Sequence, residues 1–128
     1  MPARILVVED NAANLELVRY LLASAGHEVL LAVNGARGLE VATREQPDLI
    51  ISDLQMPVMD GYALIAALQA TPPCERIPVL ALTAYSMPGD REQIMRAGFA
   101  GYLSKPIEPE HFIGQIAAFL GPGPTTPG

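Results

Sequence analysis

The sequence predicts an α/β fold in which five strands alternate with five helices. Short apolar runs recur along the chain, and each is followed by a segment whose apolar residues have helical spacing. Every link between successive strands is long enough for a helical crossover, so we expect a parallel sheet with helices on both faces. With 128 residues, 50% of them hydrophobic, the chain suffices for one domain with a real core.

The first two strand-helix units occupy the N-terminal third of the chain. The continuous apolar run Ile5–Val8 is typical of a strand buried on both faces. A helix is expected over residues 11–25, and Gly26 suits the position just after its end. Residues 27–32 follow as the second strand. An asparagine then caps a helix expected over residues 34–46, with a proline just beyond it.

The third unit begins with the apolar run Leu49–Ser52, which we interpret as a strand. The loop over residues 55–61 contains Pro57 and the turn pair Asp60-Gly61. A helix over residues 62–70 follows and ends before a pair of prolines.

The last two units complete the alternation. Residues 79–82 form the fourth strand, and a helix follows from Pro88, a residue suited to a first turn, to a glycine at position 98. Residues 100–103 form a short fifth strand, and residues 109–120 form the last helix. We therefore expect one domain over residues 1–120 and a disordered Pro/Gly-rich tail over residues 121–128.

Composition excludes several classes of function. Fourteen acidic residues against eight basic ones give a net charge of −6, which disfavours nucleic acid and anionic membrane surfaces. Cys74 is the single cysteine, so no intramolecular disulfide and no cysteine-based zinc site can form. We expect a cytoplasmic protein, because the sequence shows neither a signal peptide nor a membrane-spanning apolar stretch.

Chemically active side chains come at the ends of the predicted strands, where ligands bind in an open parallel sheet. The first strand ends at Glu9 and Asp10, and the third ends at Asp53. The fourth ends at Thr83, and the fifth ends near Lys105. Three carboxylates, a hydroxyl and an ammonium group are therefore expected at one edge of the sheet.

Three carboxylates close together repel one another unless one stays protonated or a cation lies among them. Hard oxygen ligands at an open edge suit Mg²⁺, and the lysine and hydroxyl suit phosphoryl oxygens. A carboxylate beside the metal can attack phosphorus and form an aspartyl phosphate. A single acidic residue at a strand end usually has no special role. Complementary chemical groups at four strand ends favour a functional site instead.

Four segments of the chain resemble the receiver domain of two-component response regulators. They are residues 7–11, 53–61, 82–84 and 105–106, and the resemblance extends over residues 4–120. The chain is most similar to stand-alone receivers of the chemotaxis or cell-cycle type, or to the receiver of a hybrid sensor kinase. The resemblance implies a flavodoxin-like (βα)5 sandwich with sheet order 2-1-3-4-5.

The resemblance also implies a phosphorylation site at Asp53 and a Mg²⁺ site around it. Asp10 and Asp53 would bind the metal directly, the main-chain carbonyl of Gln55 would add a third ligand, and Glu9 would act through water. Gln55 and Tyr85 resemble positions that tune the lifetime of the phosphoryl group.

Thr83 and Lys105 would each contact a phosphoryl oxygen, and Tyr102 matches the family's switch aromatic. A tyrosine in a short strand can also be simple packing, and Thr83 can be merely a β-branched strand residue. Pro106 resembles a position that follows a cis peptide bond, although a trans proline starting a turn is the plainer interpretation.

The expected partners are a sensor histidine kinase or a histidine phosphotransfer protein, and a downstream protein target. A docking patch for the phosphodonor is predicted around the phosphorylation site, although single exposed leucines are normal. The patch consists of Asn11, Asn14, Leu15, Pro106 and Ile107. We expect a monomer that catalyses only its own phosphorylation and dephosphorylation.

Three alternative functions remain at this point. A phosphatase of the haloacid-dehalogenase type would need an acid two positions after the nucleophile, where Gln55 stands. A flavin-binding module would need a phosphate-cradling loop after the first strand, where acidic residues would repel phosphate. A receiver used only as a scaffold would be favoured by a missing phosphoacceptor, but Asp53 is present.

Overall fold

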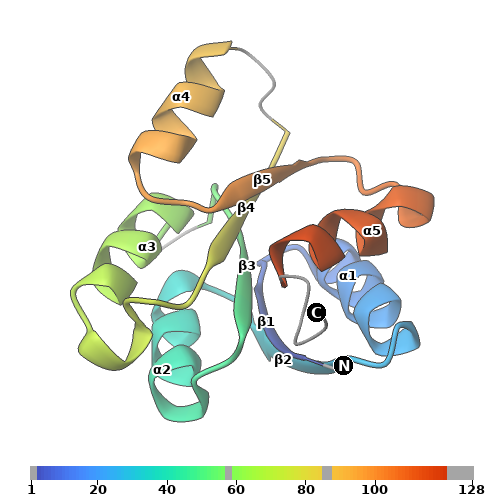
Figure 1. The fold of residues 1–128 in the computed structure, drawn as a ribbon, viewed down its shortest axis with the longest axis horizontal. Coiled ribbons are helices and arrows are strands. Elements are labelled where there is room, and N and C mark those ends of the chain that lie inside the picture. Colours follow the sequence, from blue (N-terminus) through green and yellow to red (C-terminus); the bar gives the residue numbers. More distant parts are fainter. Residues whose placement is uncertain (1–2, 57–58, 85–87, 121–128) are drawn as a thin grey trace, which may run out of the picture.

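The structure is a computed structural model, and it describes residues 3–56, 59–84 and 88–120. Its centre is a parallel sheet in the order β2-β1-β3-β4-β5, which confirms the expected sheet (Figure 1). The strands are β1 Arg4–Val8, β2 Glu28–Ala32, β3 Leu49–Asp53, β4 Val79–Thr83 and β5 Gly101–Ser104. The helices are α1 Ala12–Ser24, α2 Gly35–Glu45, α3 Gly61–Gln69, α4 Pro88–Arg96 and α5 Pro109–Phe119.

Helices cover both faces of the sheet and form two hydrophobic cores (Figure 1). One core lies between the sheet and α2, α3 and α4, and the other lies between the sheet and α1 and α5. Successive residues of β1 point alternately into the two cores, with Ile5 in one and Leu6 in the other. This explains why the central strands are continuous apolar runs rather than alternating patterns.

Side-chain caps explain where three helices begin. The side-chain oxygen of Asn11 accepts the N–H of Asn14 at the start of α1. Asn34 and Asp60 cap α2 and α3 in the same way, each accepting an N–H from the residue three positions on. Gly26 follows α1 with φ +93°, a left-handed conformation that suits glycine and ends the helix as expected.

The segment before β4 differs from the sequence-based expectation. The sequence pattern predicts no element between the helix over residues 62–70 and the fourth strand, but Pro72–Cys74 form a short 3-10 helix, and Cys74 is buried in the core that α2 and α3 cover. The chain turns inward here because Thr71 accepts the N–H of Cys74 through its main-chain oxygen, at 2.8 Å. Tyr85 and the tail over residues 121–128 lie outside the described residues.

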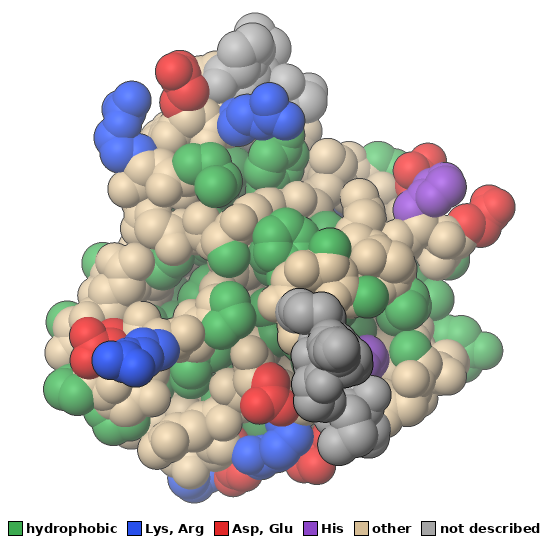
Figure 2. Space-filling view, in the orientation of Figure 1, with side chains coloured by type: hydrophobic (Ala, Val, Ile, Leu, Met, Phe, Trp, Pro, Cys, Tyr) green, Lys and Arg blue, Asp and Glu red, His purple; other side chains and the backbone are tan. Residues whose placement is uncertain are grey.

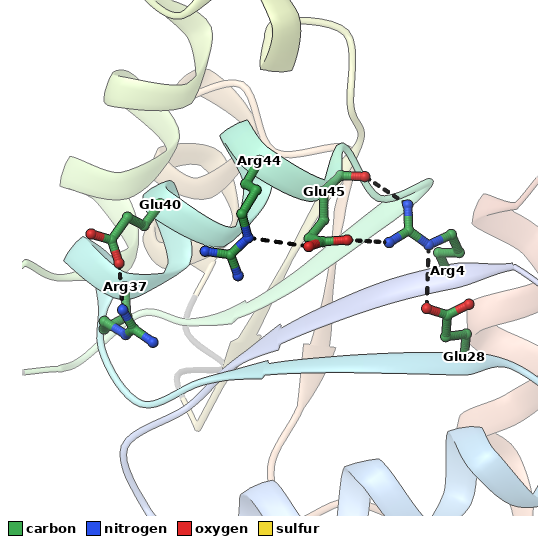
Figure 3. Close-up of polar contacts among 6 residues, drawn as sticks. All are labelled: Arg4, Glu28, Arg37, Glu40, Arg44 and Glu45. Atoms are coloured by element: carbon green, nitrogen blue, oxygen red, sulfur yellow. Dashed lines mark hydrogen bonds and ion pairs between the residues drawn. The ribbon is translucent and has the colours of Figure 1, made fainter.

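A network of ion pairs joins β1, β2 and α2 at the edge of the sheet where the strands begin (Figure 3). The guanidinium of Arg4 donates to the Glu45 carboxylate at 2.7 Å and to the Glu45 main-chain oxygen at 2.6 Å. It also pairs with Glu28 of β2 at 3.4 Å. Glu28 is exposed, and Arg4 and Glu45 are still partly exposed to solvent, so the network stabilises the fold only modestly.

The surface carries no large basic patch on the face shown in Figure 2, where basic side chains lie apart or beside acidic ones. None of the described helices is long and apolar enough to cross a lipid bilayer.

Candidate phosphorylation site

A pocket of about 370 Å³ lies where β1, β3, β4 and β5 end. The strand-end side chains predicted from the sequence all line it, together with several neighbours. The lining residues are Glu9, Asp10, Asn11, Asn14, Asp53, Leu54, Gln55, Thr83, Ala84 and Lys105. The predicted convergence of three carboxylates, a hydroxyl and an ammonium group is therefore confirmed.

The register of the parallel strands brings these residues together. Asp53, the last residue of β3, lies opposite Leu82, and Thr83, the last residue of β4, lies opposite Ser104. The N–H of Lys105 then donates to the main-chain oxygen of Thr83 at 2.8 Å, which holds the residue after β5 against the end of β4. The Lys105-Pro106 peptide bond is cis, as the resemblance implied.

The three carboxylates form a tight cluster. Each of Glu9, Asp10 and Asp53 offers an oxygen atom within 4.8 Å of the others. Glu9 is fully buried, Asp53 is 6% exposed, and Asp10 is exposed at the mouth of the pocket. The Lys105 ammonium lies 3.2 Å from Glu9 Oε1 and 3.2 Å from Asp53 Oδ1. One ammonium group thus bridges the two buried carboxylates.

Burial and charge shift the pKa values of two groups in this cluster. Burial raises the pKa of the Glu9 carboxyl, and the nearby Asp53 charge raises it further, although the Asn11 N–H donates to Oε2 at 3.0 Å and opposes the shift. Burial lowers the pKa of Lys105, but the Asp53 and Glu9 carboxylates outweigh it, and the net pKa is raised. Lys105 therefore stays charged at neutral pH.

The donor set fits a divalent cation. Three carboxylates against one ammonium leave excess negative charge, and the ligands are hard oxygen atoms beside an open pocket. Glu9 Oε1 is buried and, in the part of the chain that the structure describes, receives no hydrogen bond of suitable geometry despite its nearby ammonium. The ion pair with Lys105 compensates part of its charge, and a bound water could supply the hydrogen bond that this oxygen lacks.

The residues predicted for docking divide into two groups. Asn11 and Asn14 line the rim of the pocket, and Pro106 is exposed next to it. Leu15 and Ile107 are only partly exposed, because both pack against the core between α1 and α5. Their apolar side chains therefore contribute to the packing between α1 and α5. Only part of each side chain is left on the surface for a partner to contact.

Tyr102 lies outside the pocket lining and is half-buried on β5. Its hydroxyl accepts a hydrogen bond from Arg91 Nε of α4 at 3.1 Å. Sequence reasoning missed Arg91, because nothing in the local pattern of α4 indicates which residue of another element it contacts.

The model of the response regulator receiver domain family matches residues 5–117, which is most of the chain. The chain belongs to the response regulator receiver domain family. It is a receiver module of two-component signalling, and this family is not one of metabolic enzymes. A relative, the polar-differentiation response regulator DivK of Brucella anthropi, is 39% identical over 121 residues, which cover 94% of this chain and 98% of that protein.

Solved structures of other receivers have the same fold. The chemotaxis protein CheY4 of Vibrio cholerae is 31% identical, with a TM-score of 0.86 over 92% of this chain and 98% of its own. The receiver domain of the sensor histidine kinase PA1611 of Pseudomonas aeruginosa is 34% identical, with a TM-score of 0.86 over 94% of this chain and 99% of its own. That structure holds a magnesium ion coordinated in its active-site cleft.

Proposed function

We propose that Asp53 accepts a phosphoryl group from a phosphohistidine of a sensor histidine kinase or a histidine phosphotransfer protein. The observation that carries the proposal is the position of Asp53, which lines the pocket as one of three clustered carboxylates and lies 3.2 Å from the Lys105 ammonium. An Asp53 carboxylate oxygen attacks phosphorus, the P–N bond to the donor imidazole breaks, and the imidazole keeps the bonding electron pair.

Asp10, Asp53 and the main-chain carbonyl of Gln55 would hold Mg²⁺, with Glu9 acting through water. The metal would offset the charge that gathers between the nucleophile and the incoming phosphoryl group. Lys105 is already placed to neutralise another phosphoryl oxygen, because its ammonium lies 3.2 Å from Asp53 Oδ1.

The phosphorylated state would act on the downstream target through Thr83 and Tyr102. Thr83 lines the pocket and would move toward the new phosphoryl oxygens, and Tyr102 would rotate inward into the space released. The face formed by α4, β5 and α5 would then repack and bind the target, which is a shift between two populated states.

The remaining proposals concern the docking surface for the phosphodonor, the boundaries of the domain and the location of the protein. The phosphodonor would dock on Asn11, Asn14, Leu15, Pro106 and Ile107, which surround or adjoin the pocket. We further propose a cytoplasmic monomer whose receiver domain covers residues 1–120 and which catalyses only its own phosphorylation and dephosphorylation. Gln55, exposed at the pocket, would influence how water reaches the phosphorus.

The phosphorylation site is tested with the Asp53→Asn variant. Incubation of the wild type with acetyl phosphate and Mg²⁺ is expected to add one phosphoryl group that hydroxylamine removes, as intact-mass measurement would show. Asp53→Asn should remain unmodified, whereas the control Asp48→Asn, which keeps the oxygen that accepts the Arg4 N–H, should label fully. Stoichiometric labelling of Asp53→Asn would contradict the assignment.

The metal ligands are tested by calorimetric titration with Mg²⁺. Asp10→Ala is expected to weaken binding at least tenfold, because it removes a charged ligand. Gln55→Ala should change the affinity much less, because its proposed ligand is a main-chain oxygen. Equal losses in the two variants would show that this division of roles is wrong.

A further inference from the structure

Tyr102 is held at two different parts of its side chain by a single residue of a neighbouring helix. The Arg91 Nε group donates to the tyrosine hydroxyl at 3.1 Å. The guanidinium carbon of Arg91 also lies 5.6 Å from the centroid of the Tyr102 ring, within the range of a cation–π contact. Arg91 belongs to α4 and Tyr102 to β5, so the contact joins two elements of one face (Figure 1).

The surroundings leave Tyr102 room to move. Arg91 and Tyr102 line an open pocket on this face, together with Met95 of α4 and Phe119 of α5. Beside Tyr102, a Cβ on Gly101 would lie 2.5 Å from the Phe119 ring, so that ring occupies the space above β5. Tyr102 packs partly against the core beneath α4, and the rest of its side chain faces this open pocket, where Arg91 contacts it.

A planar guanidinium can hydrogen-bond the hydroxyl and lie against the ring at once, which an ammonium group cannot do as well. Both contacts depend on the present position of the ring, and rotation of Tyr102 toward Thr83 would break both. A contact made in only one of two states shifts the equilibrium between them toward that state.

We propose that Arg91 is a positioning residue that holds Tyr102 in its present conformation and so opposes activation of the receiver. The inference rests on the proposed switch role of Tyr102 and adds the group that sets its resting position. Loss of Arg91 should increase the fraction of protein that is competent to bind the phosphoryl group before any phosphorylation. Because the contact is largely exposed, we expect an effect of about two- to fivefold on affinity.

The test is a calorimetric titration with beryllofluoride in the presence of Mg²⁺, which mimics the aspartyl phosphate. Arg91→Ala is expected to bind it about two- to fivefold more tightly than the wild type, because less free energy goes into breaking the contact. Arg91→Lys should fall between the two. Arg96→Ala, which removes an exposed arginine from the last turn of the same helix, is the matched control and should bind like the wild type.

If Arg91 only stabilised the fold, Arg91→Ala would bind beryllofluoride with equal or weaker affinity than the wild type. A gain in this affinity therefore distinguishes the positioning role from a structural one. The Arg91→Ala effect should vanish in a Tyr102→Ala background, since no ring is left to hold. Separately, the ring carbons of Tyr102 should change their NMR chemical shifts in unphosphorylated Arg91→Ala but not in Arg96→Ala.

Two failures are distinguishable. If the wild type binds no beryllofluoride, the proposed phosphoacceptor function is wrong, and the role of Arg91 falls with it. If the wild type binds it but Arg91→Ala binds equally well or more weakly, or the gain persists without Tyr102, the proposed function stands and only the inference about Arg91 is overturned.

Discussion

Glu9 lies in an environment that a glutamate rarely occupies. Its carboxylate is fully buried, one oxygen accepts the Asn11 N–H at 3.0 Å, and the other lies 3.2 Å from the Lys105 ammonium. Burial of a carboxylate weakens the fold unless its charge is compensated, and here the Lys105 ammonium supplies that compensation. Burial favours the neutral, protonated form of the carboxyl group, and this raises the pKa of Glu9.

The raised pKa of Glu9 predicts that the free energy of unfolding depends on pH. In metal-free protein, folded Glu9 keeps its proton to higher pH than the unfolded chain, whose glutamate has a pKa of about 4.5. The folded state therefore binds more protons above that pH, and the free energy of unfolding should fall as pH rises toward the folded pKa. Lys105 does not titrate in this range, because its pKa is raised above 10.5.

Glu9→Gln should remove this slope. Urea unfolding of the wild type and the variant, measured from roughly pH 4 to 8 with a metal chelator, should show the wild type losing stability relative to Glu9→Gln as pH rises. Parallel curves for the two proteins would mean that Glu9 does not titrate above its ordinary pKa.

At the scale of elements, the first residue of α3 lies close to the last residue of β3, Asp53. Asp60 caps α3, and the next residue, Gly61, donates its N–H to the main-chain oxygen of Leu54 at 3.0 Å. A Cβ at Gly61 would lie 2.6 Å from the main-chain oxygen of Asp53, so only glycine lets the helix begin this close to the strand. The sequence pattern indicated an ordinary turn at this point.

Gly61→Ala is therefore expected to shift the backbone around Asp53, to slow its phosphorylation by acetyl phosphate and to weaken Mg²⁺ binding. Gly114→Ala is the matched control, because a Cβ there meets nothing within 4 Å. Gly114 lies within α5, where alanine should stabilise the helix by up to about 1 kcal/mol. Normal labelling of Gly61→Ala would show that the loop absorbs the extra carbon without moving Asp53.

At the scale of the whole molecule, the two cores hold the strand ends in register. Phe112 of α5 is 1% exposed and packs in the core between the sheet, α1 and α5. The pocket at the strand ends adjoins this packing, because its lining includes Asn11, which caps α1, and Lys105, which lies between β5 and α5.

Phe112→Ala is expected to lower the free energy of unfolding by about 3–5 kcal/mol, as measured by urea denaturation. Phe119→Ala, in the same helix, removes a partly exposed ring and should cost clearly less. A similar loss in both variants would indicate that the two rings contribute equally to the core, contrary to their burial.

The sequence by itself determined the order of elements, the cap of α2 and the set of strand-end residues. These features depend on local patterns: apolar runs mark the strands, Asn34 caps its own helix, and parallel strands place Asp53, Thr83 and Lys105 at one edge. The sheet order followed from the resemblance to a known family, since local patterns do not state which strands are neighbours.

Only the tertiary structure decided how these residues meet. It placed one ammonium group 3.2 Å from both Glu9 and Asp53, buried Cys74 in a core, and paired Arg91 with Tyr102. Each of these depends on side-chain direction and packing between segments that are distant in the chain, such as the ends of β1 and β5. Periodicity tells which face of an element is apolar, but contacts between elements are set by how the whole fold packs.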